Sequence, residues 1–255
     1  MNNLKKNSFK KQSNFKVLLV YPNIQMCEMM PYSIGLLTGI LRREGFTVDL
    51  FDTTFYVDKV NSQYEAYHDY VQEFDWKEKG AIFKTDIIKD FHNKIESFDP
   101  DLIAISVVEN TYSTARQMIK SLPEKLKKIP VMWGGVFATF APHLIMRDNV
   151  GDYVCIGEGD DAIVKLCKSL SENEKPEKIQ NFWIRKNGNI IKNKMGPLAD
   201  LENAPFPDYS LFEEHAIYRA MQGKIRRTIG LETQRGCTYT CAYCNSPSQV
   251  KLHKN

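Results

Sequence analysis

The sequence has no long hydrophobic run and few cysteines, and both absences exclude whole classes of protein. Among its 255 residues, no apolar stretch approaches the ~18 residues that a membrane-spanning helix needs. The first apolar stretch, residues 17–21, is too short for the core of a signal peptide. Six cysteines are too few for a disulfide scaffold in a chain of this length. The sequence therefore predicts a reduced, cytoplasmic protein with no membrane partner.

A net positive charge is also lacking once the N-terminus is set aside. Residues 1–16 hold five lysines and no acid, whereas the whole chain has a formal net charge of +3, so the remainder carries −2. Residues 1–15 are predicted to form a disordered basic tail. Because the rest has no basic surface, we expect no nucleic-acid partner. A hydrophobic content of 43% suffices for a core and excludes wholesale disorder.

Apolar runs alternate with helical patterns from residue 16 to about 171, which is typical of an α/β protein with a doubly wound parallel sheet. Residues 60–98 are predicted to be an inserted helical segment. The predicted strands are 16–21, 47–51, 102–108, 129–133 and 153–156. The predicted helices are one that Gly45 ends, one at 111–127 that Pro123 bends or breaks, and one at 159–170.

After residue 171 the pattern changes. Asn187-Gly188 lies between two short strands, 182–186 and 189–192, and predicts a hairpin. Three prolines mark residues 196–208 as a linker. A helix over 209–222 and a strand over 227–233 are predicted to follow. We therefore divide the chain into a Rossmann-like domain, a hairpin and linker, and a C-terminal piece, with the bounds 16–172, 173–225 and 226–255.

Three of the cysteines are close together in the pattern CxxxCxxC. Cys237, Cys241 and Cys244 lie within eight residues of each other, so their thiolates can face one centre. An iron–sulfur cube held by three cysteines leaves one iron open, whereas a structural zinc site closes with a fourth ligand, for which His253 is the candidate. The other three cysteines, Cys27, Cys155 and Cys167, are a weak candidate for a second cluster. Cys155 on a predicted strand and Cys167 on an apolar helix face are expected to be small buried hydrophobes.

The segment RGCTYTCAYC resembles the signature of the radical S-adenosylmethionine (SAM) superfamily, CxxxCx-aromatic-C, with Tyr243 at the aromatic position. The resemblance implies that the three cysteines bind a 4Fe-4S cluster and that SAM chelates its open iron. Reductive cleavage of SAM would then release a 5′-deoxyadenosyl radical, and Tyr243 would lie against the adenine. The strand predicted at 227–233 would be the first of that superfamily's β/α barrel. Because such a barrel needs ~200 residues or more, we expect the chain to be a fragment or a truncated product.

Glycines follow two of the predicted strands, where ligands bind in open parallel sheets. Gly134-Gly135 and Gly157-Glu158-Gly159 would let the backbone approach a bulky ligand. No GxGxxG or Walker pattern is present, so no nicotinamide or nucleoside-triphosphate site is predicted. The acidic residues Glu158, Asp160 and Asp161 suit the start of a helix and are assigned a structural role.

Several segments together resemble the cobalamin-binding domain that precedes many radical SAM barrels, as in class B radical SAM methyltransferases. The matching segments are VLLVYPN, the helix-containing segment PYSIGLLTGILRREGFTVDLFD, DPDLIAISV, VMWGGVFAT and DYVCIGEGD, and the later PFPD also fits. The resemblance implies cobalamin across the strand ends, near Thr111, Ser113, Gly134, Gly135 and Gly157. The DxHxxG motif that supplies an axial histidine is missing, which implies base-off cobalamin without a histidine ligand.

The function that these resemblances imply is radical-based methyl transfer to an unknown small-molecule or peptide substrate. A flavodoxin or ferredoxin would supply the electron, and no catalytic residue beyond the cluster is assignable. A non-catalytic cobalamin-binding or interaction module and a Cys3His zinc protein are the alternatives.

Overall fold

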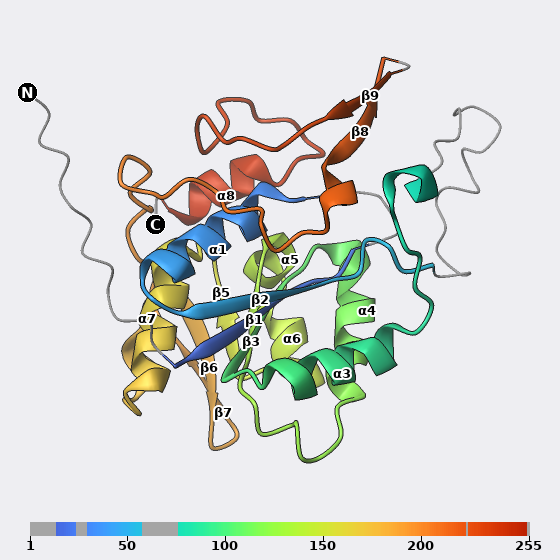
Figure 1. The fold of residues 1–255 in the computed structure, drawn as a ribbon. Coiled ribbons are helices and arrows are strands. Elements are labelled where there is room, and N and C mark those ends of the chain that lie inside the picture. The colour runs from blue at the N-terminus through green and yellow to red at the C-terminus, as the bar shows by residue number, and fades with distance from the viewer. Residues whose placement is uncertain (1–13, 24–29, 58–75, 223, 254–255) are drawn as a thin grey trace, which may run out of the picture.

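The computed structural model describes residues 14–23, 30–57, 76–222 and 224–253. Within these ranges, one sheet of seven strands has the order β2-β1-β3-β4-β5-β6-β7 (Figure 1). The parallel strands are β1 (Lys16–Tyr21), β2 (Thr47–Asp52), β3 (Leu102–Ser106), β4 (Val131–Gly134) and β5 (Tyr153–Cys155). Their order is that of flavodoxin-like folds, with the switch point between β1 and β3. The predicted fold class is confirmed.

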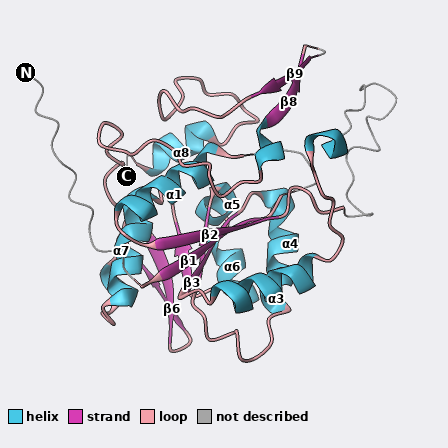
Figure 2. Ribbon diagram, viewed as in Figure 1, coloured by secondary structure: helices cyan, strands magenta, loops and turns pink. Residues whose placement is uncertain are grey.

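Helices cover both faces of this sheet (Figure 2). One face carries α1 (Tyr32–Arg43) and α7 (Asp160–Ser171). The other carries α3 (Ile87–Phe98), α4 (Glu109–Lys120), α5 (Val136–Phe140) and α6 (Pro142–Asp148). A further helix, α8 (Ser246–Leu252), lies near α1. Short 3-10 turns are η1 (Trp76–Lys79), η2 (Pro176–Lys178) and η3 (Glu214–Ile217).

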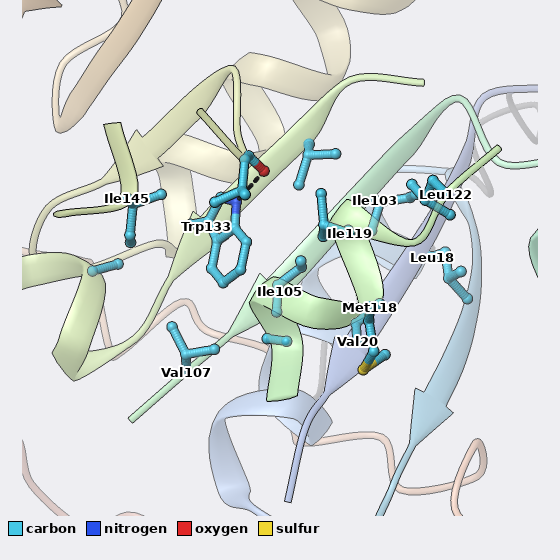
Figure 3. Close-up of a cluster of buried hydrophobic side chains, with 14 of the residues drawn as sticks. Leu18, Val20, Ile103, Ile105, Val107, Met118, Ile119, Leu122, Trp133 and Ile145 are labelled. Atoms are coloured by element: carbon cyan, nitrogen blue, oxygen red, sulfur yellow. Dashed lines mark hydrogen bonds between the residues drawn. The ribbon is translucent and has the colours of Figure 1, made fainter. Parts of the chain in front are cut away.

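The alternation of side chains along β1 explains the two-faced core. Val17 and Leu19 enter the core beneath α1 and α7, whereas Leu18 and Val20 enter the core beneath α3 to α6. The continuous apolar run from Val17 to Tyr21 is therefore buried on both sides of the sheet. Trp133 of β4 is fully buried in the second core, and its indole N–H donates to the carbonyl oxygen of Val150 at 2.9 Å (Figure 3).

Several predicted elements occur close to the expected residues. The strand at 16–21 has the predicted bounds, and α4 ends at Lys120, ahead of Pro123. The hairpin also has the predicted bounds, as β6 (Phe182–Lys186) and β7 (Asn189–Lys192), and β6 pairs antiparallel with β5. Its turn uses Asn187 and Gly188, both at positive φ. Residues 87–98 form the expected helix, while residues 1–13, Cys27 and residues 58–75 lie outside the described residues.

Two predicted elements are wrong, both in the C-terminal quarter. In place of a helix over 209–222, η3 is followed by β8 (Tyr218–Met221), which pairs antiparallel with β9 (Lys224–Arg227). Gln222 follows β8 with a positive φ of 53° and begins the connection from β8 to β9. The spacing of apolar residues in the sequence does not indicate this turn. In place of a strand over 227–233, β9 ends at Arg227 and residues 228–233 are irregular. The N–H of Thr228 donates to the carbonyl of Ile217, which extends the β8–β9 pairing by one residue.

The proline-rich linker packs against α1 at two glycines. A Cβ added at Gly39 would lie 2.6 Å from the carbonyl oxygen of Phe206, and one added at Gly35 would lie 2.8 Å from the ring of Tyr209. The backbone N–H of Asp208 donates to the carbonyl of Gly35 at 2.8 Å, and the Asp208 carboxylate pairs with Arg42. Glycines four residues apart on one helix face therefore let the linker lie directly on the sheet domain.

Candidate functional site

A cavity of about 790 Å³ opens at the carboxyl ends of the parallel strands. Its floor consists of the ends of β1, β3, β4 and β5 and the loops that follow them. The start of α1, the linker, the segment before the cysteines and the C-terminal helix α8 also line the cavity. The lining residues from these last three parts, together with His253 after α8, are Leu198, Ala199, Leu201, Glu232, Arg235, Gly236, Ser246, Gln249, Val250, Leu252 and His253.

Two glycine loops on the cavity floor are held together by one buried threonine. Gly135 begins α5 with φ 90°, and Gly157 follows β5 with φ 76°. The hydroxyl of Thr139 donates to the carbonyl of Gly135 and accepts from the N–H of Gly157, both at 3.0 Å. A Cβ at Gly135 would lie 2.6 Å from the carbonyl oxygen of Val107, so this backbone admits no larger residue. Sequence analysis did not single out Thr139 as a residue of this site. The sequence feature that could have indicated it is a threonine one helical turn after the Gly134-Gly135 pair.

The structure brings together four of the five residues expected around cobalamin. Thr111, Gly134, Gly135 and Gly157 all line the cavity. Thr111 is buried and its hydroxyl accepts from the N–H of Val108 at 3.2 Å, which fixes the start of α4. Ser113 is not part of the lining; it lies exposed two residues further along α4.

The cysteine motif lies on an exposed segment next to this cavity. Cys237, Cys241 and Cys244 are all exposed free thiols. Among the residues that the structure describes, no three His, Cys, Asp or Glu side chains are arranged to hold a metal. A hydrogen bond between the Cys244 thiol and the Ser246 hydroxyl, together with one from the Ser246 backbone N–H to the Cys244 sulfur, lowers the pKa of that thiol, which favours the thiolate that metals bind. The donor set therefore fits a three-cysteine cluster chemically, although the thiols do not converge.

Two other residues predicted around the motif lie apart from it. Tyr243 is 92% exposed and does not line the cavity. His253 lines the cavity, where its Nε2 atom is 3.5 Å from the place of a Cβ at Gly157. The Cys3His zinc arrangement is thus not formed in the described residues.

The cysteine segment is joined to the cavity rim by an ion cluster that sequence analysis missed. Arg235 forms a bidentate pair with Asp160, with Nη1–Oδ2 at 2.9 Å and Nη2–Oδ1 at 2.8 Å. It also pairs with Glu158 at 3.3 Å and with Glu232 at 2.9 Å. Burial alone would lower the pKa of Arg235, but the carboxylates of Asp160 and Glu232 outweigh it and raise that pKa above its usual value. Two of the three acids assigned to a helix start, Glu158 and Asp160, therefore share a cationic partner that is remote in sequence.

The two described cysteines outside the motif match the expectation that they are buried. Cys155 and Cys167 are buried in the core beneath α1 and α7. Burial raises the pKa of the Cys155 thiol to about 12 and raises that of Cys167 as well. Neither thiol has the character of a metal ligand.

As for membranes, none of the helices in the described ranges combines the length and apolar character needed to cross a bilayer.

Comparison with known proteins identifies the domain that forms the cavity. The B12 binding domain family matches residues 28–167, more than half of the chain. The chain belongs to this family. Those residues include the glycine loops at Gly135 and Gly157, which lie on the cavity floor.

Similar proteins extend this picture. The chain is 27% identical over 180 residues to the uncharacterized methyltransferase PH0819 of Pyrococcus horikoshii, covering 70% of this chain and 38% of that protein. It is 24% identical over 126 residues to the anaerobic magnesium-protoporphyrin IX monomethyl ester cyclase of a Synechocystis strain, covering 48% of this chain and 24% of that one.

Two solved structures share the fold. The radical SAM methyltransferase TsrM of Kitasatospora setae has a TM-score of 0.56 at 22% identity, covering 91% of this chain and 41% of TsrM. The cobalamin-dependent SAM radical enzyme OxsB has a TM-score of 0.62 at 20% identity, covering 88% of this chain and 27% of OxsB. At these identities the likeness shows the fold alone. The chain spans less than half the length of each of these relatives.

Proposed function

We propose that this chain carries the cobalamin-binding domain and the cluster motif of a cobalamin-dependent radical SAM enzyme. The observation that carries the proposal is the position of the cavity. It lies at the carboxyl ends of four parallel strands of a B12-binding fold, and the segment leading into CxxxCxxC forms part of its wall. In open α/β sheets this edge is where ligands bind.

The cavity lining suits cobalamin. Backbone at Gly134, Gly135 and Gly157 would face the corrin and its nucleotide tail, because glycine allows close approach of a bulky ligand. Residues 22–31, between β1 and α1, contain no histidine in the sequence, so we propose that cobalamin binds base-off without a histidine ligand from this loop. When bound, cobalamin would supply the methyl group for transfer.

The three cysteines of the motif would hold a 4Fe-4S cluster, and SAM would bind its open iron. Their exposure leaves the thiols accessible to iron, and the lowered pKa of Cys244 favours ligation. Tyr243 would lie against the adenine of SAM. A flavodoxin or ferredoxin would supply electrons, and the substrate would be a small molecule or a peptide. The reaction class that we propose is radical-based methyl transfer, in keeping with the names of PH0819 and TsrM.

The proposal is tested one cofactor at a time. The chain, reconstituted anaerobically with iron and sulfide, should bind four irons and give an EPR signal on reduction. The triple variant Cys237→Ala, Cys241→Ala, Cys244→Ala should lose this signal while still retaining hydroxocobalamin after desalting. A colourless protein that contains only zinc would refute the cluster.

For cobalamin, two glycine variants form a matched pair. Gly135→Ala places a Cβ against the carbonyl of Val107 on the cavity floor and should reduce cobalamin retention. Gly188→Ala has a similar positive φ of 79°, lies in the β6–β7 turn, and would contact nothing within 4 Å, so retention should match the wild type. If the wild-type chain retains no cobalamin after desalting, the proposed binding function is wrong.

A non-catalytic cobalamin-binding module is the second candidate, and the separation of the three exposed thiols favours it. Incubation with SAM and dithionite distinguishes the two. The enzyme should release 5′-deoxyadenosine, whereas a binding module should retain cobalamin and release none.

A further inference from the structure

The guanidinium group of Arg235 joins the segment that leads into the cysteine motif to the sheet domain, and the hydroxyl of Tyr209 donates to the carbonyl of Gly230 in the same segment at 2.6 Å. The side chain of Arg235 is only 19% exposed and that of its bidentate partner Asp160 only 13%. Planar, bidentate pairs between arginine and a carboxylate are the strong and directional ones, and lysine does not reproduce their geometry. By comparison, the Arg116–Asp148 pair on the other face of the sheet uses one guanidinium nitrogen of an arginine that is 38% exposed.

The two sides of this ion cluster come from functionally different parts of the chain. Asp160 and Glu158 directly follow the glycine loop at Gly157, on the cavity floor. Arg235 lies two residues before Cys237, the first cysteine of the motif. All three charged side chains line the cavity, so the cluster lies where the cobalamin-binding domain meets the cysteine segment.

The linker is joined to the same cluster. The backbone N–H of Ala199 donates to the Glu158 carboxylate at 2.6 Å, while that carboxylate also faces Arg235. The side chain of Asn181 donates to the backbone carbonyl of Glu158 at 3.0 Å, which fixes the loop from the β6 side. Three segments remote in sequence therefore converge on the loop after β5.

We propose that Arg235 is a positioning residue: held by Asp160 and Glu158, it fixes the start of the cysteine motif at the rim of the cobalamin cavity. This inference rests on the proposed function, because it deepens the relation between the two cofactor sites. It predicts that the guanidinium sets the distance between the cobalt and the cluster, and that loss of the ion cluster frees the cysteine segment without unfolding the sheet.

The first test needs no cofactor. Amide hydrogen exchange of residues 229–250 should accelerate about tenfold in Arg235→Gln, the scale expected when a charge-assisted pair is lost. Arg235→Lys should give an intermediate exchange rate, because lysine keeps the positive charge but cannot form the bidentate pair with Asp160. Exchange in β1 to β5 should stay as in the wild type, and exchange of residues 229–250 should be unchanged in the control Arg116→Gln, which removes an ion pair on the other face of the sheet. Asp160→Asn, which keeps one acceptor oxygen, should also give an intermediate rate and serves if Arg235→Gln fails to fold.

The second test uses the reconstituted chain. A reduced cluster near cobalamin should speed relaxation of the cob(II)alamin EPR signal, measured by its microwave power saturation. We expect this enhancement to fall in Arg235→Gln, to be partly restored in Arg235→Lys, and to persist in Arg116→Gln. Unchanged exchange and unchanged saturation in Arg235→Gln would overturn the positioning role. If the wild type instead binds neither cofactor, the proposed function fails while the exchange test still decides whether Arg235 fixes the segment.

Discussion

The cysteines of the sheet domain and those of the C-terminal segment differ in almost every physical respect. Cys155 and Cys167 are buried among apolar side chains, and burial raises the pKa of each thiol. Cys237, Cys241 and Cys244 are exposed on a segment with little regular structure. The same residue type thus serves as a core hydrophobe in one region and as an accessible thiol in the other. The difference shows that the sheet domain uses its described cysteines for packing, whereas the cysteine segment has its thiols on the surface.

Thiol alkylation should separate the two regions by the largest factor. With a pKa raised from 9.0 to about 12, the Cys155 thiolate is about a thousandfold scarcer than that of an unperturbed thiol, and burial slows its reaction further. Native protein treated with iodoacetamide should therefore be labelled at the three motif cysteines, and Cys155 and Cys167 should react only after unfolding in guanidinium. Peptide mass mapping assigns each site and keeps Cys27 separate. Rapid labelling of Cys155 in the native state would contradict the buried assignment.

Aromatic residues should show the same contrast in stability. Trp133→Ala removes a fully buried indole and its hydrogen bond to Val150, so the free energy of unfolding should fall by about 3–5 kcal/mol. Tyr243→Ala removes a side chain that is 92% exposed and should change it by no more than about 0.5 kcal/mol. Urea unfolding followed by circular dichroism measures both. Comparable losses would mean that the cysteine segment has a packed core of its own.

The same contrast explains which features the sequence could predict. In β1 the run from Val17 to Tyr21 is apolar and buried, and the hairpin follows from Asn187-Gly188, so local patterns suffice in the sheet domain. The glycine loops could be placed at the cavity because parallel strands end at a common edge. In the C-terminal segment, long-range contacts decide: the backbone of Thr228 bonds to Ile217, and Arg235 bonds to Asp160. No local periodicity encodes such contacts, so the predicted helix and strand there were wrong.

A partly buried acid, Asp52, gives the sheet domain a pH dependence of intermediate size. Burial raises the pKa of Asp52, at the end of β2, from 3.8 to about 6, although hydrogen bonds from Thr54 oppose this shift. Well below pH 3.8 the Asp52 carboxyl is protonated in both the folded and the unfolded protein, so it does not change the free energy of unfolding. As the pH rises from 3.8 towards 6, Asp52 ionises in the unfolded protein before it ionises in the folded one, so the free energy of unfolding falls. The folded protein then remains less stable by this amount at neutral pH.

Asp52→Asn should therefore remove this fall and raise the free energy of unfolding at pH 7 by about 1–3 kcal/mol. Thr54→Val removes the hydroxyl that donates to Asp52 and should move the midpoint of the fall to higher pH. Urea unfolding between pH 4 and pH 7 measures both variants. A wild-type stability that rises over this range, with no change in the asparagine variant, would contradict the raised pKa.

The smallest effect concerns the contact of the linker with α1. The linker joins the sheet domain to the C-terminal part of the chain that contains the cysteine segment. Replacing glycine by alanine inside a helix ordinarily stabilises it by about 1 kcal/mol. At Gly35 the added methyl group would meet the ring of Tyr209, which can turn aside, so Gly35→Ala should keep part of this gain. At Gly39 it would meet the backbone carbonyl of Phe206, which can move only if the linker moves. Gly39→Ala should therefore be less stable than Gly35→Ala by about 1 kcal/mol in urea unfolding.

The two glycine variants also report on the linker itself. Because Arg42 and Gly35 hold Asp208 next to this contact, hydrogen exchange of residues 205–212 should accelerate in Gly39→Ala more than in Gly35→Ala. Equal stabilisation of the two variants by about 1 kcal/mol, with no change in exchange, would mean that the linker does not lie on α1. A selective loss in Gly39→Ala would instead establish that the path towards the cysteine segment is fixed at two places: by backbone contact at α1 and by the ion pair of Arg235 with Asp160.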